Sequence, residues 1–539
     1  MTAASLREFV ADTPAEQDST LAAAHSALSQ AFTVTAEPGA AGRRTRRQTW
    51  LDTFDWRLYK VGLTLEFEQA RRGGRLLLSK ADGTPQAEQS VTRWPRRPGL
   101  AEDLPDGPVR DRILVLTSPR ALLPIAEAVS TVSVTRLLNA DGKTVARLVA
   151  ECVTVTAPPG NTAAVTTAEL PPRLAVTEVR GYPGQARRAA ALLAGLPGIS
   201  HASQGLFPTA LTALGRRPAD YTSGVDAEIT AAMPAPVAVA RLLLRLLDTI
   251  ELNVPGVLRD IDTEFLHDFR VAVRRTRSAI KLLGQVLPAD LAEHYKTEFK
   301  WLGDLTTPTR DLDVHLLGFD AMTEQLVAAS PADLEPLRAF LARRRAREFR
   351  RLAAALRGPR FHAITQDWRK ALLELRDVDG PRRRRPTASE LALSTTGRSF
   401  RRIAAQGGAI TPASPPESLH NLRKRAKELR YLLEFFAPLH DPVAYRKVVS
   451  DLKQLQDCLG EFQDDEVQRH EIGALADAML TEREAPAATL LAMGEIAANL
   501  AVGQAEARAE FAARFGRFAG PAGRERVRVL LASQTQGRR

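Results

Sequence analysis

The feature that most constrains this chain is a segment that occurs twice. HDFRVAVRRTRSAIK begins at His267, and HNLRKRAKELRYLLE begins at His420, 153 residues later (420 − 267). The same offset relates further pairs over about 50 positions without a gap, which predicts a tandem duplication of a multi-helix unit. The other matched pairs are Glu264 and Glu417, Arg270 and Arg423, Arg277 and Arg430, Lys300 and Lys453, Leu302 and Leu455, Asp304 and Asp457, Asp311 and Asp464, and Val314 and Val467.

Both copies have the periodicity of an amphipathic helix. At about 100° per residue, each copy places a histidine and several cations on a single face. The cationic faces are His267, Arg270, Arg274, Arg277 and Lys281 in the first copy, and His420, Arg423, Lys427 and Arg430 in the second. The opposite faces, which we expect to be buried, are Phe265, Phe269, Ala272, Val273, Thr276, Ile280 and Leu283, and then Leu422, Ala426, Leu429, Leu433 and Phe436.

The chain around these copies changes character once. Residues 1–215 contain strand-like runs between turn signals, which predicts an α+β domain with a largely antiparallel sheet. Residues 228–520 have helical periodicity, with repeat halves at 228–375 and 390–520. The expected strands are Phe32–Ala36, Thr49–Asp52, Leu63–Glu68, Arg75–Lys80, Thr131–Asn139, Thr144–Val155 and Leu174–Val179, with helices at 16–31 and 183–196. The expected helices of the second part are Pro236–Glu251, Thr263–Val286, Ala289–Leu302, Pro331–Leu356, Ser418–Phe436, Val443–Leu459 and Ala487–Phe515.

The net charge of +11 indicates an anionic partner, either nucleic acid, a polyphosphate or a membrane surface. A general enrichment in arginine is the alternative explanation of this charge. Cys152 and Cys458 are the only cysteines, so neither a disulfide framework nor a cysteine metal site is expected. The first residues lack the features of a secretory signal, and no run approaches the roughly 18 apolar residues of a membrane span, so we expect a cytoplasmic protein.

Two cationic faces packed against each other would repel unless an anion or nearby acids compensated them. A linear polyanion is the ligand that such a groove would suit, because arginine offers paired donors to phosphate oxygens. The alternative is a solvated face that is neutralised by local acids, for which Glu264, Glu417, Glu428 and Glu434 are the candidates.

The acids and histidines of the repeat favour binding over chemistry. Asp311, Asp313 and Asp464 are expected to orient cations or cap helices, because no ligand spacing specifies a metal. A glutamate three residues before each histidine can fix its tautomer. No nucleophile recurs at a fixed offset in both copies, so we predict no catalytic residue and no metal ligand.

Nucleic acid is the less favoured anion. Single-strand binders interleave aromatic residues with cations, whereas only 6% of this chain is aromatic and Tyr431 alone accompanies the cationic faces. The basic run Arg382–Arg385 is expected to be a solvated linker between the halves, with a contribution to an anion surface as the alternative.

The helical part resembles the CHAD family, the conserved histidine α-helical domain. The residues that carry the resemblance are His267 to Arg277, Arg310 to Val314, His420 to Tyr431, and Leu455 to Gly460. The resemblance implies a pair of four-helix bundles that binds inorganic polyphosphate in a basic groove, and an association with polyphosphate granules. The residues expected to bind are His267, Arg270, Arg274, Arg275, Arg277, Lys281, Lys300, Arg310, His420, Arg423, Lys424, Lys427, Arg430, Tyr431 and Lys453.

The β-rich part resembles a CYTH, or triphosphate tunnel, domain. The resemblance rests on Thr49 to Leu65, Arg75 to Lys80, and Arg136 before a hairpin at Asp141-Gly142. It implies a β-barrel, and in active members an Mg²⁺- or Mn²⁺-dependent attack on triphosphates. This sequence lacks the family's ExExK signature and has Glu66 and Glu68 where arginines are usual, and these acids are expected to repel a triphosphate. Lys80, Arg136, Glu151 and Glu178 are the remnants of such a site.

The function predicted from the sequence is therefore non-catalytic binding of inorganic polyphosphate by the duplicated helical domain. A metal-dependent triphosphatase in the β domain is the first alternative, and a basic nucleic-acid-binding helical protein is the second. No cofactor is predicted unless the β domain is active.

Overall fold

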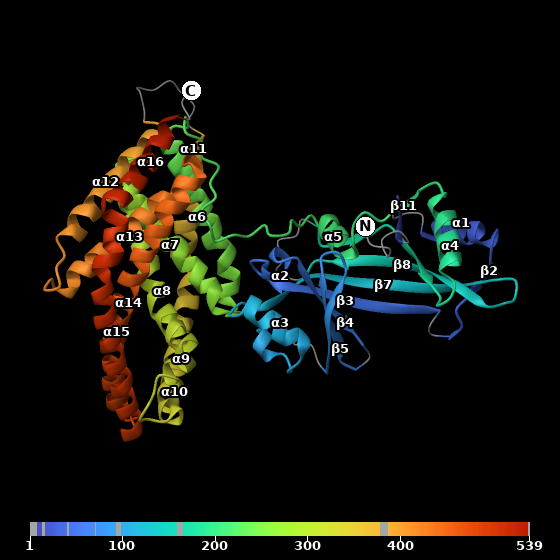
Figure 1. Ribbon diagram of the computed structural model, residues 1–539, viewed down its shortest axis with the longest axis horizontal. Helices are drawn as coiled ribbons and strands as arrows, with labels where there is room; N and C mark the ends of the chain where they lie inside the picture. The colour runs from blue at the N-terminus through green and yellow to red at the C-terminus, as the bar shows by residue number, and fades with distance from the viewer. Residues whose placement is uncertain are drawn as a thin grey trace. The chain divides into compact units, whose positions relative to one another are not determined.

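The computed structural model describes residues 8–12, 17–39, 42–70, 72–92, 99–158, 165–377 and 386–536. The chain divides into two compact units, Met1–Thr222 and Ser223–Arg539, which are described here separately. Figure 1 shows the strands in the first unit and the long helices in the second. Within the described ranges, no helix is both long enough and apolar enough to cross a membrane. The predicted basic linker Arg382–Arg385 lies outside the described residues.

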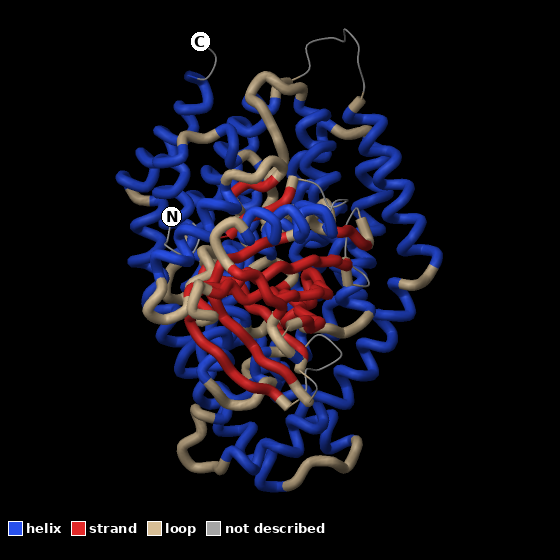
Figure 2. The backbone as a smooth tube through the Cα atoms, turned by 90° about the vertical axis from the view of Figure 1, so that its right-hand side faces the viewer, coloured by secondary structure: helices blue, strands red, loops and turns tan. Residues whose placement is uncertain are grey.

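The first unit is built on a large antiparallel sheet, drawn in red in Figure 2. Its strands pair in the order β11-β1-β10-β8-β7-β3-β4-β5-β6, while β2 pairs with β7 and β9 pairs with β8. Among the described residues, no pairing joins the two ends of this path. The strands are β1 (Glu8–Ala11), β2 (Thr33–Ala36), β3 (Arg43–Thr53), β4 (Leu63–Gln69), β5 (Gly74–Lys80), β6 (Pro85–Val91), β7 (Leu122–Leu138), β8 (Thr144–Thr156), β9 (Thr167–Glu169), β10 (Arg173–Glu178) and β11 (Ile199–His201). The helices are α1 (Gln17–Ser29), α2 (Arg57–Lys60), α3 (Pro108–Thr117), α4 (Pro183–Ala194) and α5 (Leu206–Ala213), with a short turn η4 (Ala101–Asp103).

The centre of this sheet is the predicted hairpin of β7 and β8. Asn139 begins the turn, where its side chain accepts hydrogen bonds from the backbone N–H groups of Asp141 and Lys143. Gly142 has φ +73°, a left-handed conformation that suits glycine, so the local sequence determines where the chain reverses. Alternate residues of each strand then point to opposite faces, and α1 and α4 pack on the face that carries Leu148 and Leu174.

The second unit consists of helices that repeat with the offset found in the sequence. Helices α6, α7 and α8 start at residues 235, 263 and 289, and α12, α13 and α14 start at 388, 416 and 442, so each start moves by 153. The helices are α6 (Ala235–Leu258), α7 (Thr263–Leu283), α8 (Ala289–Leu317), α9 (Phe319–Thr323), α10 (Glu335–Leu356), α11 (Pro359–Arg376), α12 (Ala388–Gly408), α13 (Pro416–Phe435), α14 (Pro442–Thr481), α15 (Ala487–Ala519) and α16 (Pro521–Gln536). Short turns are η5 (Gly284–Val286), η6 (Pro331–Leu334) and η7 (Ala437–Leu439).

The two halves are related by an approximate two-fold axis. The N–H of Ala235 donates to the carbonyl of Pro386 at 2.9 Å, and the N–H of Ala388 donates to the carbonyl of Met233 at 2.8 Å. These bonds are equivalent under the repeat, because 388 − 235 and 386 − 233 both equal 153. Helices α7 and α13, the two copies of the histidine helix, contact each other directly. The duplication therefore places the two cationic faces together, as an isologous contact requires.

The predicted apolar faces are confirmed. Every residue expected on the buried side of α7 and α13 is at most 4% exposed. The antiparallel sheet followed by a duplicated helical region is confirmed as the fold class. The sequence did not indicate α2, α3, α5, α9, α11, α12 or α16, nor the strands β1, β6, β9 and β11, and it ended α8 and α14 too early. Those strands are short or polar, and α2, α5 and α9 are at most eight residues long.

A glycine sets the close approach of α6 and α7. A Cβ atom added to Gly256 would lie 2.2 Å from the ring of Phe265, whose side chain is 2% exposed. We expect Gly256→Ala to lower the free energy of unfolding by about 1–3 kcal/mol, because a packed ring cannot move aside without strain. The matched control is Gly494→Ala in α15, where nothing lies within 4 Å. That change should raise stability by up to about 1 kcal/mol through helix propensity. Urea unfolding followed by circular dichroism measures both, and equal effects would contradict the packing argument.

Candidate functional site

Six residues from both repeats form what we call the cation seam. They are His267, Arg270 and Arg274 from α7, Arg310 from α8, and Arg423 and Lys427 from α13. Two hollows of about 590 and 540 Å³ open along it, and both are lined by His267, Arg274 and Arg423. The hollows are therefore adjoining parts of one groove between the repeats.

The groove is mixed in charge. Five cations and five carboxylates line the larger hollow, and four arginines and three carboxylates line the smaller one. The cations come mainly from α7 and α13, whereas Asp457, Glu461 and Asp464 come from α14. A ligand in the larger hollow would meet a cationic wall on one side and an acidic wall on the other.

The repeated aspartates hold the repeated arginines. Arg423 donates from Nη2 to Asp464 at 2.8 Å, and Arg270 Nη2 lies 3.8 Å from Asp311. Arg270 also donates to the Gly303 carbonyl and to the hydroxyls of Thr306 and Thr307. An orienting role for these aspartates was expected from the sequence. The two copies differ, because Asp464 accepts a hydrogen bond from its arginine whereas Asp311 lies beyond hydrogen-bond distance.

Cations in the seam are crowded and partly desolvated. Burial lowers the pKa of Lys427 to about 8, and Arg423 and Arg274 lower it further in the same direction. Among the described residues, no hydrogen bond or ion pair to the Lys427 amine is found. Burial likewise lowers the pKa of Arg270, with Arg274 and Arg310 contributing. Burial and the neighbouring cations therefore both disfavour the charged forms of Lys427 and Arg270, although carboxylates equal the cations in number around the larger hollow.

The two histidines have different neighbours. Burial lowers the pKa of His267, and the charge of Arg310 lowers it too, so its imidazole is neutral near pH 7. His420 Nδ1 pairs with Gln463, which occupies the position equivalent to Arg310 (463 − 310 = 153), and not with Glu417. Of these two histidines, His267 lines both hollows and His420 lines neither. The two copies of the site therefore differ in charge, and the copy in the first repeat is the more cationic.

Two of the predicted binding residues form ion pairs between the two halves. Arg275 donates to Glu434 at 2.8 Å and to the Ser223 carbonyl at 2.6 Å, and Lys281 donates to Glu428 at 2.6 Å. Positions 275 and 428 are equivalent under the repeat, and so are 281 and 434. The two ion pairs are therefore images of each other in which cation and anion have changed places. This exchange can be read in the sequence, because the equivalent positions of the two repeats carry opposite charges.

The remaining predicted residues are distributed around the groove. Arg430 lines the larger hollow and donates to Glu434, and the Tyr431 ring lies 5.9 Å from the Arg274 guanidinium. Arg277 lies against Gly303. The exposed Lys300, Lys424 and Lys453 line neither hollow, and Lys300 pairs with Asp304 on its own helix. Sequence reasoning missed His315, which lines the smaller hollow and pairs with Glu471 at 2.7 Å.

Comparison with known families identifies the domain around this groove. Residues 241–473 match the family model of the CHAD domain, from within α6 to within α14. Residues 241–473 form a CHAD domain. Both histidine helices fall inside this range, and so do the residues that line the two hollows, except Ser223 at the larger one. The cation seam is therefore the interface between the two CHAD repeats.

Solved structures and curated proteins were also compared. A CHAD domain from the plant Ricinus communis is 26% identical, covers 55% of this chain and 96% of its own, and has a TM-score of 0.46. PptA from Streptomyces chartreusis is 17% identical, with coverages of 52% and 99% and a TM-score of 0.42. A putative adenylyl cyclase, HpAC1 from Hippeastrum, described as having a dominant triphosphatase activity, is 13% identical, with coverages of 40% and 98% and a TM-score of 0.25. These TM-scores are low, so the CHAD assignment rests on the family model. No curated protein matched.

Outside the CHAD domain, the sheet is consistent with a CYTH-like fold, and the acids of β4 are neutralised within it. Arg46 donates to Glu66 at 2.8 Å and to Glu68 at 3.1 Å, and Arg75 donates to Glu68 at 2.6 Å. The expectation that these acids repel a triphosphate assumed that their negative charges are uncompensated. That assumption is wrong, because arginines on β3 and β5 compensate them. The same pairs leave these arginines occupied.

The four residues predicted to be remnants of a triphosphate site do not lie together. Strand alternation and the pairing register place Arg136 and Glu151 on one face of the sheet, and Lys80 and Glu178 on the other. Arg136 Nε and Glu151 Oε1 are buried without a hydrogen-bond partner. In the described part of the chain, no group of three or more histidines, cysteines or acids is placed to hold a metal ion. The residues present therefore do not fit the Mg²⁺ or Mn²⁺ that the CYTH resemblance implies.

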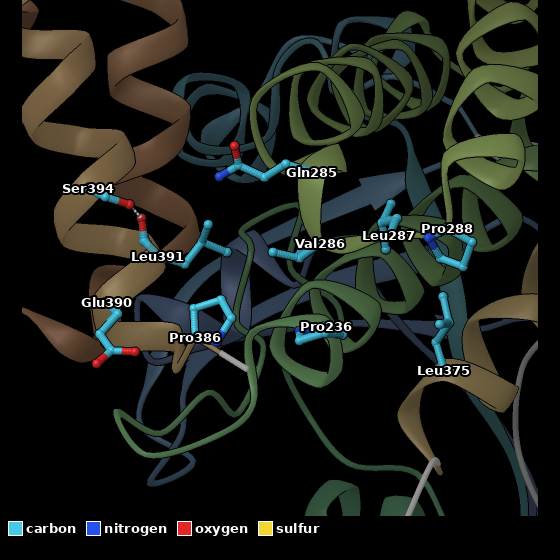
Figure 3. A pocket seen from close by; sticks show the side chains of 10 residues that line it. All are labelled: Pro236, Gln285, Val286, Leu287, Pro288, Leu375, Pro386, Glu390, Leu391 and Ser394. Atoms are coloured by element: carbon cyan, nitrogen blue, oxygen red, sulfur yellow. Dashed lines mark hydrogen bonds between the residues drawn. The ribbon is translucent and has the colours of Figure 1, made fainter. Parts of the chain in front are cut away.

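A separate hollow of about 680 Å³ lies where α6, η5, α11 and α12 meet (Figure 3). Its walls are mostly apolar, with Val286, Leu287 and Leu391 among them. Among the described residues that line it, Glu390 is the charged one, and its carboxylate accepts a hydrogen bond from the N–H of Thr387 as the cap of α12. This hollow has no chemistry in common with the cation seam.

Proposed function

We propose that the CHAD domain binds inorganic polyphosphate in the groove along the cation seam and does not catalyse its reaction. The presence of a CHAD domain supports a function related to polyphosphate or triphosphate. The observation that carries the proposal is the crowding of cations from both repeats around Lys427, whose amine has no hydrogen bond or ion pair among the described residues. Burial and the charges of Arg423 and Arg274 lower its pKa to about 8. A polyanion relieves this repulsion, and guanidinium groups supply paired donors to its oxygens.

The ion pairs of the seam support binding rather than oppose it. Asp464 and Asp311 each engage one side of a guanidinium group and fix its direction, while other N–H groups stay available. Arg423 Nε and Gln456 Nε2, both on residues that line the larger hollow, have no acceptor among the described residues. Binding of this kind would hold the protein at cytoplasmic polyphosphate granules.

The binding should weaken with rising pH. Lys427 has a folded-state pKa of about 8, below its ordinary value of 10.5, so it is charged below pH 8 and becomes neutral above it. A polyanion favours the ammonium form, so we expect binding to take up protons above pH 8 and affinity to fall there. Calorimetry at pH 8.5 in buffers of different ionisation enthalpy measures this uptake.

The matched control for this experiment is Lys427→Arg, which keeps a permanent charge at the same position. It should bind polyphosphate with an affinity that is nearly constant between pH 7 and 9. A wild-type affinity with no fall above pH 8 would contradict the role of Lys427. Stronger binding of nucleic acid than of polyphosphate at equal charge would replace the proposed ligand.

A further inference from the structure

Helix α10 carries a row of arginines on its outer face that lies outside the cation seam. The spacings of four, seven, eight and fourteen residues place these side chains along one side of the helix, over about 21 Å at about 1.5 Å per residue. All five are exposed, with side-chain exposures of 57, 50 and 69% for Arg343, Arg347 and Arg351. The arginine row consists of Arg343, Arg347, Arg350, Arg351 and Arg357, the last being the residue that follows the helix.

The arginine row has a surplus of positive charge. Its described carboxylate partners are Glu348, which pairs with Arg347 and Arg351, and Glu484, which pairs with Arg343. Arg350 and Arg357 donate instead to backbone carbonyls, those of Ala346 and Leu258. Five cations thus face two carboxylates, and like charges one turn apart repel.

Folding of α10 does not depend on the row. The other side of the helix is buried, with Leu341, Leu352 and Leu356 at most 1% exposed. Arg345, which is not in the row, points inward and donates from Nε to Asp313 of α8 at 2.8 Å. Because α10 packs on α8, and α8 also carries Arg310 of the cation seam, the row lies one helix away from the groove.

We propose that the arginine row of α10 is a second, exposed surface for inorganic polyphosphate, so that a long chain is held by the row and by the groove together. This inference rests on the proposed function of the groove. Once one part of a chain is bound in the groove, the rest is presented to the row at high effective concentration, which makes affinity depend on chain length. The aromatic side chain of this stretch, Phe349, lies against Arg345 and away from the row. The row itself therefore offers only guanidinium groups, which contact phosphates and read no base.

The test uses the full-length chain with Arg347, Arg350 and Arg351 all changed to glutamine. Affinities for short and long polyphosphate are measured over a range of salt concentrations. We expect the short-chain affinity to stay within about twofold, and the long-chain affinity to fall at least about tenfold. The slope of log affinity against log salt should fall by about two, because each lost phosphate contact contributes about 0.7. The matched control changes the exposed Arg398, Arg401 and Arg402 of α12 to glutamine, which removes the same charge and should alter neither affinity.

Each outcome decides a separate point. An unchanged long-chain affinity, or an equal loss with the α12 control, would overturn the arginine row as a site. A loss of duplex DNA binding without a loss of polyphosphate binding would assign the row to nucleic acid and would also overturn the proposal. If the wild-type protein bound no short chains, the groove function would fail, whereas the row would still be tested by long chains alone.

Discussion

Full-length protein in which Arg274, Arg423 and Lys427 are all replaced by glutamate is expected to lose polyphosphate affinity by at least about 100-fold. Each charge-assisted hydrogen bond contributes about 1.5–3 kcal/mol, and a factor of ten corresponds to about 1.4 kcal/mol, so loss of even two contacts reaches this range. Reversal adds repulsion of the ligand. Titration of labelled polyphosphate at fixed salt measures the loss, because ionic strength sets the reference affinity.

The control for this experiment reverses three cations that the sequence also nominated. Lys300, Lys424 and Lys453 are exposed and line neither hollow, so changing them to glutamate alters the net charge by the same amount. A small loss is expected from long-range electrostatics alone. Equal losses in the two variants would show that the ligand is attracted by the overall charge and that the seam is not its site. The milder changes Arg274→Gln and Lys427→Gln test the seam if reversal disturbs folding beside Asp464.

Arg275→Glu is expected to lower the free energy of unfolding of the helical unit by about 2 kcal/mol. The change breaks the ion pair with Glu434 and the hydrogen bond to Ser223, and it leaves two carboxylates together at a site where the side chains of Arg275 and Glu434 are 15 and 18% exposed. The equivalent pair is more open, because the Lys281 side chain is 62% exposed. Lys281→Glu should therefore cost less than about 1 kcal/mol.

The double variant Arg275→Glu with Glu434→Arg distinguishes an ion pair from simple loss of packing. It should recover part of the stability, although Arg430, which also pairs with Glu434, would then face a cation. Urea unfolding monitored by far-ultraviolet circular dichroism gives the coupling free energy of the cycle. Additive effects of the two single changes would show that the pair does not link the halves.

The sequence alone predicted the duplication, the two histidine helices and their buried faces, because each depends on an offset or a period along the chain. It could not distinguish Lys300 and Lys281 from Arg274, since all are cations on helix surfaces. Which of them line a groove is decided by how α7 and α13 cross and by which carboxylate each one meets. Gln463 and Arg310 occupy equivalent positions of the repeat, yet Gln463 pairs with His420 whereas the charge of Arg310 lowers the pKa of His267. The alignment of the repeats did not predict this difference between the two histidines.

The mixed charge of the groove was also beyond sequence reasoning. Asp457 and Glu461 lie on α14, 27 to 38 residues after the cations of α13, and only tertiary packing brings them to the opposite wall. The arginine row of α10 was visible as a run of arginines in the sequence. Its orientation outward was not, since the same helix turns Arg345 inward to Asp313.

The exchanged ion pairs between α7 and α13 determine which surfaces can recognise each other. If two first repeats met through this face, Arg275 of each would lie against Lys281 of the other, and two second repeats would bring Glu428 against Glu434. Both encounters place like charges together twice, whereas a first repeat and a second repeat satisfy both pairs. The exchanged charges therefore favour contact between a first repeat and a second repeat over contact between two like repeats. It disfavours assembly of the chain through like halves, even though the two halves share their fold.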